Sequence, residues 1–382
     1  MNKSASVVII GGGISGNAIA YELAKRGQKD IVLLEKKFLT AGSTGRCGAG
    51  IRMQWGTKLN CIMSKYSVER YEHLNEELDY EHDIEFKQGG YLMCAATSKE
   101  MEQFALNVKL QNSLGIPSRM ITPQEALEII PYINTDYMIG GAFCQKDGHL
   151  NPFHTTQAFA NAAQRLGVCI EKFTTVTGID VDNGKVIGVQ TDKGYIATNV
   201  VVDCAGGYSQ YIAKMAGIDL PLYSQRHQIL VTEPVEPLQG PMFMGFAHNI
   251  YCQQSPHGSF IMGRGDDEEP KDGRITSGWT FLEEMAKNCV KLLPLLKDLT
   301  VVRQWSGLYN MSPDKQPIYG HAPNVEGFYM ASGFSGHGFM FGPVTGVVMA
   351  EMILGLSPTV DASQLCFDRF EKGQLFIEPS VV

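Results

Sequence analysis

A glycine-rich turn between two short apolar segments constrains this chain more than any other feature. The β-branched run 7–10 (VVII) leads directly into residues 11–16 (GGGISG). A helix-like stretch to Arg26 then connects to a second apolar run, 31–34 (IVLL), which Glu35 follows. This order of strand, glycine turn, helix, strand and acid is typical of a dinucleotide-binding βαβ unit.

The three spaced glycines of this turn have separate physical roles. Gly11 allows the tight turn, Gly13 lets the backbone approach a pyrophosphate, and Gly16 lets the helix pack closely on the sheet. The diphosphate would lie on the free N–H groups at the helix N-terminus, where the helix dipole favours negative charge.

The acid after the second strand indicates which dinucleotide fits. Glu35 lies nineteen residues after Gly16, at the position where an acidic residue accepts hydrogen bonds from ribose hydroxyls. Its carboxylate would repel a 2′-phosphate. The sequence therefore disfavours NADP, even though Lys36 and Lys37 follow the acid.

Length, charge and cysteine usage are those of a soluble enzyme. The chain has 382 residues, of which 44% are hydrophobic, and a net charge of −8, which argues against disorder and against a nucleic-acid partner. It contains no run of about eighteen apolar residues, so no transmembrane helix is expected. The nine cysteines are scattered without CxxC spacing, which predicts a cytoplasmic protein with reduced thiols and neither a disulfide framework nor a metal site.

Elements of a dinucleotide-binding domain recur at three separated places, of which the βαβ unit is the first. The second place contains a helix, a strand, a hairpin turn and another strand, at 155–166, 168–171, 182–184 and 200–202. The third contains the strand 328–331, the glycine-rich stretch 332–338 and the helix 344–354, which Gly355 ends.

The stretches between these places predict a second domain. They contain strand-like segments at 89–94, 138–144, 228–232, 250–262 and 299–309. We expect a dinucleotide-binding domain of residues 1–85, 147–217 and 321–382, and a substrate domain of residues 86–146 and 218–320. The fold class is α/β, with a second α+β domain on an antiparallel or mixed sheet.

Two motifs resemble a known family. They are residues 42–52 (GSTGRCGAGIR) and 333–340 (GFSGHGFM), and further matches at 147–152 and 305–320 extend the resemblance over essentially the whole chain. The sequence resembles the FAD-dependent amino-acid oxidoreductases that include D-amino-acid oxidase, sarcosine oxidase and glycine oxidase. It is most similar to the β-subunit type of heterotetrameric sarcosine oxidase and to dye-linked L-proline dehydrogenase. The resemblance implies a Rossmann-like, glutathione-reductase-like FAD-binding domain.

The resemblance also implies how FAD would lie. Its ADP part would extend over the glycine turn and Glu35, and Ser43, Thr44 and Arg46 would hold the pyrophosphate and the flavin side. Backbone N–H groups of the 336–340 turn would lie beneath the pyrimidine edge of the flavin, where they favour the reduced state. The expected FAD contacts are Gly11, Gly13, Ile14, Ser15, Gly16, Glu35, Lys36, Ser43, Thr44, Arg46, Cys47, Gly48, Gly50, Val176, Ala205, Gly206, Gly307, Gly333, Gly336, His337, Gly338, Phe339 and Met340.

Arg52 is the expected substrate contact. In sarcosine oxidases an arginine in the matching Ile-Arg context pairs with the substrate carboxylate, which a guanidinium can hold through two parallel hydrogen bonds. Monomeric sarcosine oxidase adds a lysine where this chain has Met340. Binding of the carboxylate is therefore either weaker here or completed by other residues. The further candidates are Tyr251 and His337 as catalytic residues, Trp55, Tyr251 and Met340 as substrate contacts, and Phe341 and Trp305 as pocket walls; Tyr251 and His337 can equally be structural.

No general base, catalytic triad or metal cluster stands out in the sequence. This fits the chemistry that the resemblance implies, in which the amine binds neutral and a hydride passes from its α-carbon to flavin N5. FAD is expected to be non-covalent, because monomeric relatives carry a cysteine where this chain has Gly307. Sarcosine oxidase β-subunits attach a second flavin, FMN, to a histidine that aligns with Pro152, so any FMN here would be held non-covalently at a subunit interface.

We therefore expect oxidation of a small amino acid, with proline, hydroxyproline or sarcosine as leading candidates, and transfer of the electrons to a partner subunit or a dye. Monomeric sarcosine oxidase has an oxygen-activating lysine on the strand after its equivalent of Tyr251. Here residues 252–263 contain no Lys or Arg, the aligned positions are Ile261 or Met262, and Arg264 falls past the strand. The alternatives are glycine or D-amino-acid oxidation, 2-hydroxy-acid or glycerol-3-phosphate dehydrogenation, and a non-catalytic flavoprotein subunit.

Overall fold

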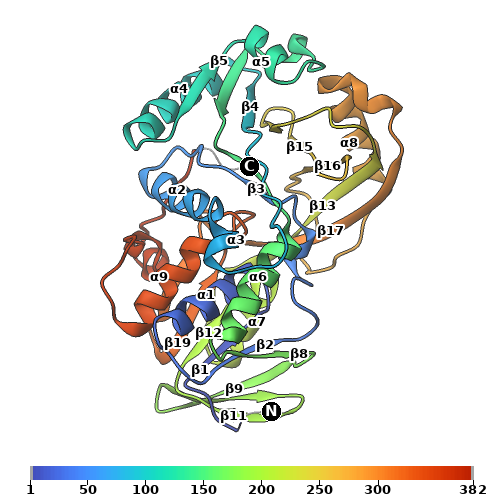
Figure 1. Ribbon diagram of the computed structural model, residues 1–382. Coiled ribbons are helices and arrows are strands. Elements are labelled where there is room, and N and C mark those ends of the chain that lie inside the picture. The colour runs from blue at the N-terminus through green and yellow to red at the C-terminus, as the bar shows by residue number, and fades with distance from the viewer. Residues whose placement is uncertain (1–2, 380–382) are drawn as a thin grey trace.

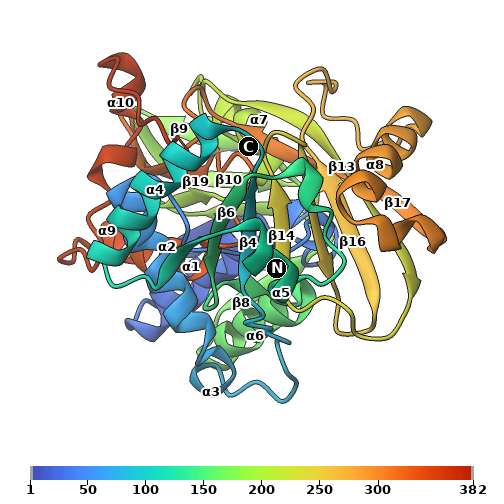
Figure 2. The same cartoon turned by 90° about the horizontal axis from the view of Figure 1, so that it is seen from above.

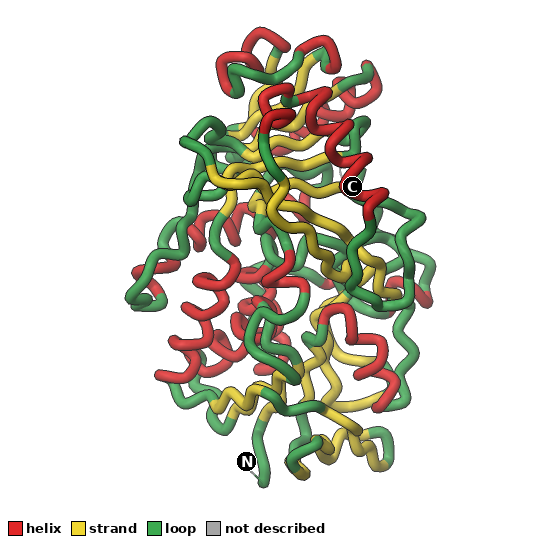
Figure 3. The backbone as a smooth tube through the Cα atoms, turned by 90° about the vertical axis from the view of Figure 1, so that its right-hand side faces the viewer, coloured by secondary structure: helices red, strands yellow, loops and turns green. Residues whose placement is uncertain are grey.

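The structure is a computed structural model that describes residues 3–379, and two large sheets dominate it. Figure 1 shows the nine-stranded sheet in the lower part of the molecule and the eight-stranded sheet in the upper part. Figure 3 shows the strands of the upper sheet lying above the helices of the lower part. Among residues 3–379, no helix is long and apolar enough to cross a membrane.

The nine-stranded sheet is built around the predicted βαβ unit. Its strands are β1 (Val7–Ile10), β2 (Ile31–Glu35), β8 (Cys169–Lys172), β9 (Val176–Asp182), β10 (Lys185–Thr191), β11 (Gly194–Ala197), β12 (Val201–Asp203), β18 (Ile318–Ala322) and β19 (Val325–Ser332). β1 pairs in parallel with both β2 and β12, and β12 pairs in parallel with β19. The hairpin strands β9, β10 and β11 are antiparallel to one another.

The two faces of β1 belong to two different cores. Val7 and Ile9 pack with α1 (Ile14–Lys25), α6 (Pro152–Arg165) and α9 (Gly342–Leu354), which cover one face of the sheet. Val8 and Ile10 pack with side chains of β9, β10 and α7 (Ser209–Met215) on the other face. A strand that is buried on both faces shows a continuous apolar run rather than alternation, which explains the composition of 7–10.

The eight-stranded sheet is mixed. Its order is β17 (Val301–Met311), β13 (Tyr223–Pro234), β16 (Ser259–Arg264), β15 (Ile250–Gln254), β14 (Met242–Gly245), β4 (Tyr91–Ala95), β6 (Gly140–Cys144) and β5 (Ser118–Ile121). Only the β4–β14 pair is parallel among the strand pairs described within this sheet. The prediction of an antiparallel or mixed sheet is thereby confirmed.

Helices cover the faces of this second sheet unevenly. α8 (Trp279–Leu292) and α5 (Pro123–Ile129) share a core with Leu92 and Phe260 on one face, and α4 (Ser98–Ser113) packs near Tyr91 and Met242 on the other. Figure 2 shows α8 beside β13 and β16, and α4 on the opposite side. The remaining elements are β3 (Gly50–Ile51), which pairs with β7 (Gly148–His149), α2 (Lys58–Tyr71), α3 (Leu74–Glu77), α10 (Asp368–Glu371) and the 3-10 turns at 43–46, 135–137, 206–208, 294–298 and 363–365.

Most predicted elements are present, with shifted ends. The helix predicted to begin at residue 155 begins at Pro152, because Asn151 accepts hydrogen bonds from the N–H groups of Phe153 and His154 and proline is well suited to the first helical turn. The strands of the nine-stranded sheet fall in or beside the three predicted segments, and β18 begins at Ile318, before the predicted boundary at residue 321. The domain boundaries themselves stay a prediction.

Candidate functional site

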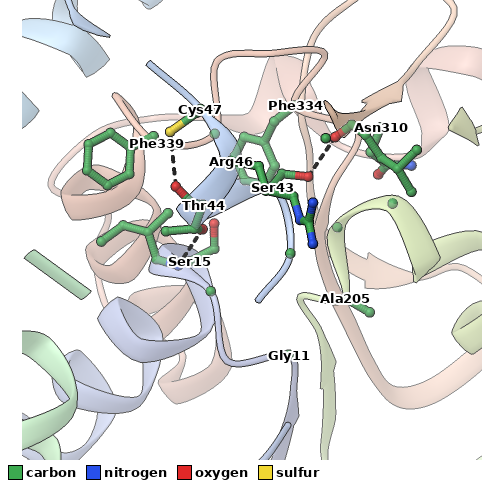
Figure 4. A pocket seen from close by; sticks show the side chains of 18 of the residues that line it. Gly11, Ser15, Ser43, Thr44, Arg46, Cys47, Ala205, Asn310, Phe334 and Phe339 are labelled. Carbon is green, nitrogen blue, oxygen red and sulfur yellow. Dashed lines mark hydrogen bonds between the residues drawn. The ribbon is translucent and has the colours of Figure 1, made fainter. Parts of the chain in front are cut away.

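A cavity of about 660 Å³ lies between the two sheets. Its walls come from the β1–α1 turn, residues 41–50, the turn at 204–208 and the turn at 334–340 on one side. On the other side, β4, β13, β14, β15 and β17 of the eight-stranded sheet contribute side chains. Figure 4 shows the cavity with Gly11 below it and Ser43, Thr44 and Arg46 beside it.

The glycine turn is as tight as the sequence predicts. Gly11 has φ +118°, and a Cβ atom there would collide with the carbonyl of Cys204. A Cβ at Gly16 would collide with the carbonyl of Gly11, so this glycine sets how closely α1 approaches the strand, although it does not line the cavity. The backbone N–H of Ile14, at the start of α1, donates to Thr44 Oγ1 at 3.1 Å.

Glu35 lines the cavity in a fixed position. Its Oε2 accepts from the N–H of Gly12 at 2.8 Å, and its Oε1 accepts from the N–H of Lys37 at 2.7 Å. A carboxylate oxygen can accept more than one hydrogen bond, so both oxygens keep capacity for ribose hydroxyls. Lys36 also lines the cavity, and its Nζ lies over the ring of Tyr208, 3.0 Å from the ring centre.

The segment 43–47 is anchored to β17. Ser43 Oγ donates to the carbonyl of Leu308 at 2.6 Å, and Arg46 donates to the carbonyls of Ala41 at 3.1 Å and Ser306 at 2.9 Å. The thiol of Cys47 donates to the carbonyl of Thr44 at 3.1 Å, and burial raises its pKa to about 11 (Figure 4). The segment therefore joins the two sheets at the cavity.

The turn before α9 presents backbone donors to the cavity. Gly336 has φ +97°, and a Cβ there would lie 2.6 Å from the ring of Tyr309. Within residues 3–379, the N–H groups of Gly338, Phe339 and Met340 have no hydrogen-bond partner, and all three residues line the cavity. Free donors at the start of a helix attract negative charge.

These features together fit an extended dinucleotide. An acid placed for ribose, a glycine turn at a helix N-terminus and a second set of free N–H groups line one continuous cavity. The cavity volume lies within the range of ligand sites in proteins. The residues present therefore fit FAD, whose adenosine would lie at Glu35 and whose ring system would lie at the 336–340 turn.

Arg52 is the buried cation at the other end of the cavity. Only 1% of its surface is exposed, yet it lines the cavity. Its guanidinium carbon lies 4.0 Å from the centre of the Trp55 ring, and its Nη1 donates to the carbonyl of Gln54 at 2.9 Å. Burial lowers its pKa, and the nearby Tyr91, Glu378 and Asp147 oppose that shift.

Asp147 braces the loop that carries Arg52. Its carboxylate accepts from the N–H of Met53 at 2.8 Å and from Gln54 Nε2 at 3.0 Å. Burial raises the pKa of Asp147 to about 7, although these hydrogen bonds and the charge of Arg52 act in the opposite direction. Trp55, which the sequence suggested as a substrate contact, lies behind Arg52 and does not line the cavity.

His337 lies beside this arginine loop and lines the cavity. Its ring meets that of Trp55 edge-on, with 4.7 Å between centres. Burial lowers its pKa to about 3, with a contribution from the charge of Arg52, so the imidazole is neutral. Within the described chain, its buried Nδ1 has no hydrogen-bond partner.

The structure brings nearly all the predicted site residues to this one cavity. Every expected FAD contact except Gly16 and Gly333 lines it, as do Arg52, Tyr251, His337 and Met340. The expected aromatic walls from Trp55, Phe341 and Trp305 are not part of the lining; Phe341 stacks on Trp55, and Trp305 Nε1 donates to the carbonyl of Arg46. Other lining residues were not suggested by the sequence; those from the eight-stranded sheet include Tyr91, His227, Met242 and Met244, which come from strands without a recognisable motif.

Comparisons with known proteins indicate the same cofactor. The model of the family described as FAD dependent oxidoreductase matches residues 6–352. The sarcosine oxidase subunit beta of Rhodobacter capsulatus is 31% identical, over 99% of this chain and 91% of the relative. The crystal structure of L-proline dehydrogenase from P. horikoshii is 36% identical, covers 98% of this chain and 100% of its own, and superposes with a TM-score of 0.94.

A relative with a different kind of name is also similar. The mitochondrial pyruvate dehydrogenase phosphatase regulatory subunit of Mus musculus is 30% identical over 96% of this chain. The match covers 43% of that longer protein. Similar chains therefore occur in proteins whose names describe catalysis and in one whose name describes regulation.

Proposed function

The chain belongs to the FAD-dependent oxidoreductase family, and we propose that it oxidises a small amino acid of the proline, hydroxyproline or sarcosine type to the imine. The names of two similar proteins, L-proline dehydrogenase and sarcosine oxidase subunit beta, support this substrate class. When bound, FAD supplies the hydride acceptor for the α-carbon. The chain holds it without a covalent bond, since Gly307 offers no side chain for one.

The observation that carries the proposal is Arg52. It is a buried cation that lines the cavity and lies over the ring of Trp55, with its guanidinium carbon 4.0 Å from the ring centre. A guanidinium in a water-poor cavity binds a carboxylate through two parallel charge-assisted hydrogen bonds. This contact would fix the α-carbon relative to the 336–340 turn, and such positioning is the main contribution that a protein makes to hydride transfer.

The other charged groups of the cavity favour a substrate with one carboxylate. The other cationic side chains of the lining are Lys36 and Lys37, which follow Glu35 at the adenosine end, and Arg46, which donates to the carbonyls of Ala41 and Ser306. A second anionic group, as in glycerol 3-phosphate, would need a further cation near Arg52. The apolar lining from Tyr91, Met242 and Met244 suits a compact body such as a pyrrolidine ring.

The backbone donors of the 336–340 turn support the reaction from the cofactor side. Negative charge develops on the ring system as it is reduced, and fixed N–H groups at the start of a helix stabilise negative charge. The free N–H groups of Gly338, Phe339 and Met340 are suited to this role.

We propose further that the electrons leave through a partner subunit or an artificial dye, in a cytoplasmic protein. The word subunit in the name of the Rhodobacter capsulatus relative supports a hetero-oligomer. The comparisons name no FMN, and the proposal does not include the second flavin that the sequence resemblance suggested.

A non-catalytic flavoprotein subunit is the second candidate. The regulatory name of the mouse relative favours it. One observation argues against it. Burying an arginine costs free energy, and a chain without a substrate would gain nothing from a buried Arg52 that lines the cavity on a loop held by Asp147.

An anaerobic substrate panel tests the proposal. The flavin-loaded protein is mixed with L-proline, D-proline, 4-hydroxyproline, sarcosine and glycine, and with 2-hydroxy acids and glycerol 3-phosphate as controls. We expect the oxidised-flavin absorption band to bleach with at least one of the amino acids and with none of the controls. Bleaching by a control alone would contradict the substrate class, and no bleaching at all would favour the non-catalytic candidate.

A further inference from the structure

Three aromatic rings stack on the face of the eight-stranded sheet that lines the cavity. His227 of β13 stacks on Tyr309 of β17, with 4.2 Å between ring centres and 5° between planes. It also stacks on Tyr251 of β15, with 5.8 Å between centres and 7° between planes. All three residues line the cavity, and no sequence motif pointed to His227.

Two glycines make space for this stack. Tyr251 reaches His227 by crossing β16 at Gly263, where a Cβ atom would collide with the tyrosine hydroxyl. Tyr309 lies against Gly336, where a Cβ would be 2.6 Å from its ring. The backbone is therefore open at the two points where the tyrosine rings must pass, which fixes both rings beside the histidine.

Both tyrosine hydroxyls meet the same histidine nitrogen. His227 Nε2 lies 3.3 Å from the hydroxyl oxygen of Tyr251 and 3.5 Å from that of Tyr309. Within residues 3–379, neither hydroxyl has another hydrogen-bond partner. Burial lowers the pKa of His227 to about 4 and raises the pKa of both phenols, so all three groups are neutral at pH 7.

One neutral nitrogen cannot satisfy two hydroxyl protons. Nε2 of a neutral imidazole offers either one lone pair or one N–H. If it offers the lone pair, it accepts from one hydroxyl and leaves the proton of the other free. If it offers the N–H, it donates to a hydroxyl oxygen and leaves both hydroxyl protons free. In either tautomer at least one tyrosine O–H of Tyr251 or Tyr309 remains available to the cavity.

We propose that His227 is a positioning residue that directs a tyrosine O–H toward the substrate carboxylate, so that Arg52 and a neutral hydroxyl hold the carboxylate together. The inference rests on the proposed function, because it takes an amino acid as the substrate. Met340 lines the same cavity, but its side chain has neither a charge nor a hydrogen-bond donor, so this side chain cannot provide the second contact. A hydroxyl donor held by a neutral histidine provides it without a second cation.

The test compares substrates with and without the carboxylate. His227→Phe keeps a flat ring for stacking but removes Nε2, and His227→Gln restores a polar group near that position. Dissociation constants are measured from anaerobic flavin reduction by proline and by prolinol, the alcohol that lacks the carboxylate. We expect His227→Phe to raise the dissociation constant of proline by about tenfold to hundredfold and that of prolinol by less than twofold. His227→Gln should recover most of the loss.

Two further variants identify the hydroxyl and control for structural damage. Tyr251→Phe or Tyr309→Phe should reproduce the loss, and combining that variant with His227→Phe should add little, because both remove the same contact. His248→Phe is the matched control. The Nε2 of this histidine donates to the carbonyl of Tyr137, outside the cavity lining, and its replacement should leave the dissociation constants of both substrates unchanged.

A binding measurement separates this inference from the proposed function. Pyrrole-2-carboxylate has the carboxylate but no oxidisable α-carbon, and its binding is followed by the shift of the flavin spectrum. We expect His227→Phe to weaken it by the same factor as proline. If no amino acid reduces the wild-type flavin, the proposed function fails while this titration still decides the inference. Equal losses for proline and prolinol, or no loss of pyrrole-2-carboxylate affinity, would overturn it.

Discussion

Arg52 is nearly inaccessible to water, and a buried guanidinium is costly unless its surroundings compensate for lost hydration. The ring of Trp55, the carbonyl of Gln54 and the negative field of Asp147 and Glu378 provide that compensation. We propose that this buried cation is held in place to bind the carboxylate of a substrate.

Glu35 offers a direct test of the cofactor end. Glu35→Arg replaces an acceptor for ribose hydroxyls by a donor and breaks the contacts to the N–H groups of Gly12 and Lys37. We expect the variant to purify without FAD, measured as the ratio of flavin to protein absorbance. Glu326→Arg, which changes an exposed carboxylate on the same sheet, is the control and should stay yellow. Full flavin occupancy in Glu35→Arg would show that the βαβ unit does not bind the adenosine of FAD.

Asp147 gives a prediction for pH. Burial raises its folded-state pKa to about 7 from an ordinary value of 3.8, so between these values the unfolded chain releases a proton that the folded chain retains. This contribution to stability is present at low pH and is lost as pH rises toward about 7, at roughly 1.4 kcal/mol per unit. Asp147→Asn lacks this term. As pH rises from 4 to 7, the wild type should therefore lose stability relative to Asp147→Asn. Above pH 7 the difference between their free energies of unfolding should stay constant. A difference that is independent of pH would contradict the assignment.

At the scale of elements, α2 is held at its start by the C-terminal segment. Glu378 accepts from the N–H of Gly56 at 2.7 Å, from Thr57 Oγ1 at 2.6 Å and from Asn60 Nδ2 at 3.0 Å. A carboxylate at a helix N-terminus satisfies free N–H groups and complements the helix dipole. Because the loop of Arg52 leads directly into α2, this contact also fixes the base of the candidate substrate site.

Glu378→Gln tests the contact. The amide cannot accept all three hydrogen bonds and carries no charge, so we expect a loss of about 1–3 kcal/mol in the free energy of unfolding. Denaturant titration measures it. Glu371→Gln, at an exposed position of α10, is the matched control and should change stability by less than about 0.5 kcal/mol. An unchanged unfolding midpoint in Glu378→Gln would show that the segment does not stabilise α2.

Elements that depend on neighbouring residues can be predicted from the sequence, whereas contacts between distant strands cannot. The βαβ unit and the helix that Gly355 ends are predictable, because each depends on residues close together in the chain. The stack of Tyr251, His227 and Tyr309 is not, because β15, β13 and β17 come together only through pairings between distant segments. The aromatic side chain of Trp55 suits a pocket wall, and no local signal in the sequence indicates that it lies behind Arg52.

Across the whole molecule, the two sheets line opposite sides of the cavity. We propose that the nine-stranded sheet and its turns provide most of the FAD contacts, and that Tyr91, His227 and Tyr251 of the eight-stranded sheet lie on the substrate side. The family and the fold class could be recognised from two short motifs. The substrate-side lining could not, since it is an open sheet face whose side chains can change without disturbing those motifs.

The second sheet also bears on the electron acceptor. A Cβ atom at Gly263 would point toward Tyr251, so Ile261 of β16 lies on the same sheet face as Tyr251 and Met262 points into the opposite core. Arg264 ends the strand in ion pairs with Asp266 and Glu284 and does not line the cavity. Oxygen accepts its first electron slowly unless a positive charge stabilises superoxide. We predict slow reoxidation of the substrate-reduced protein in air-saturated buffer, accelerated by a dye. Reoxidation as fast as in efficient flavin oxidases would contradict this.

Anaerobic reduction of Arg52→Ala is the sharpest test of whether Arg52 binds the carboxylate of an amino-acid substrate over FAD. Flavin absorbance before mixing shows that the cofactor is retained, and Arg52→Lys, which keeps the charge but loses the planar fork, provides an intermediate case. We predict that the substrate dissociation constant of Arg52→Ala rises by a factor equivalent to about 2–5 kcal/mol while FAD stays bound, with Arg52→Lys between the variant and the wild type. A dissociation constant equal to that of the wild type in a fully flavin-loaded Arg52→Ala protein would exclude Arg52 as the carboxylate contact.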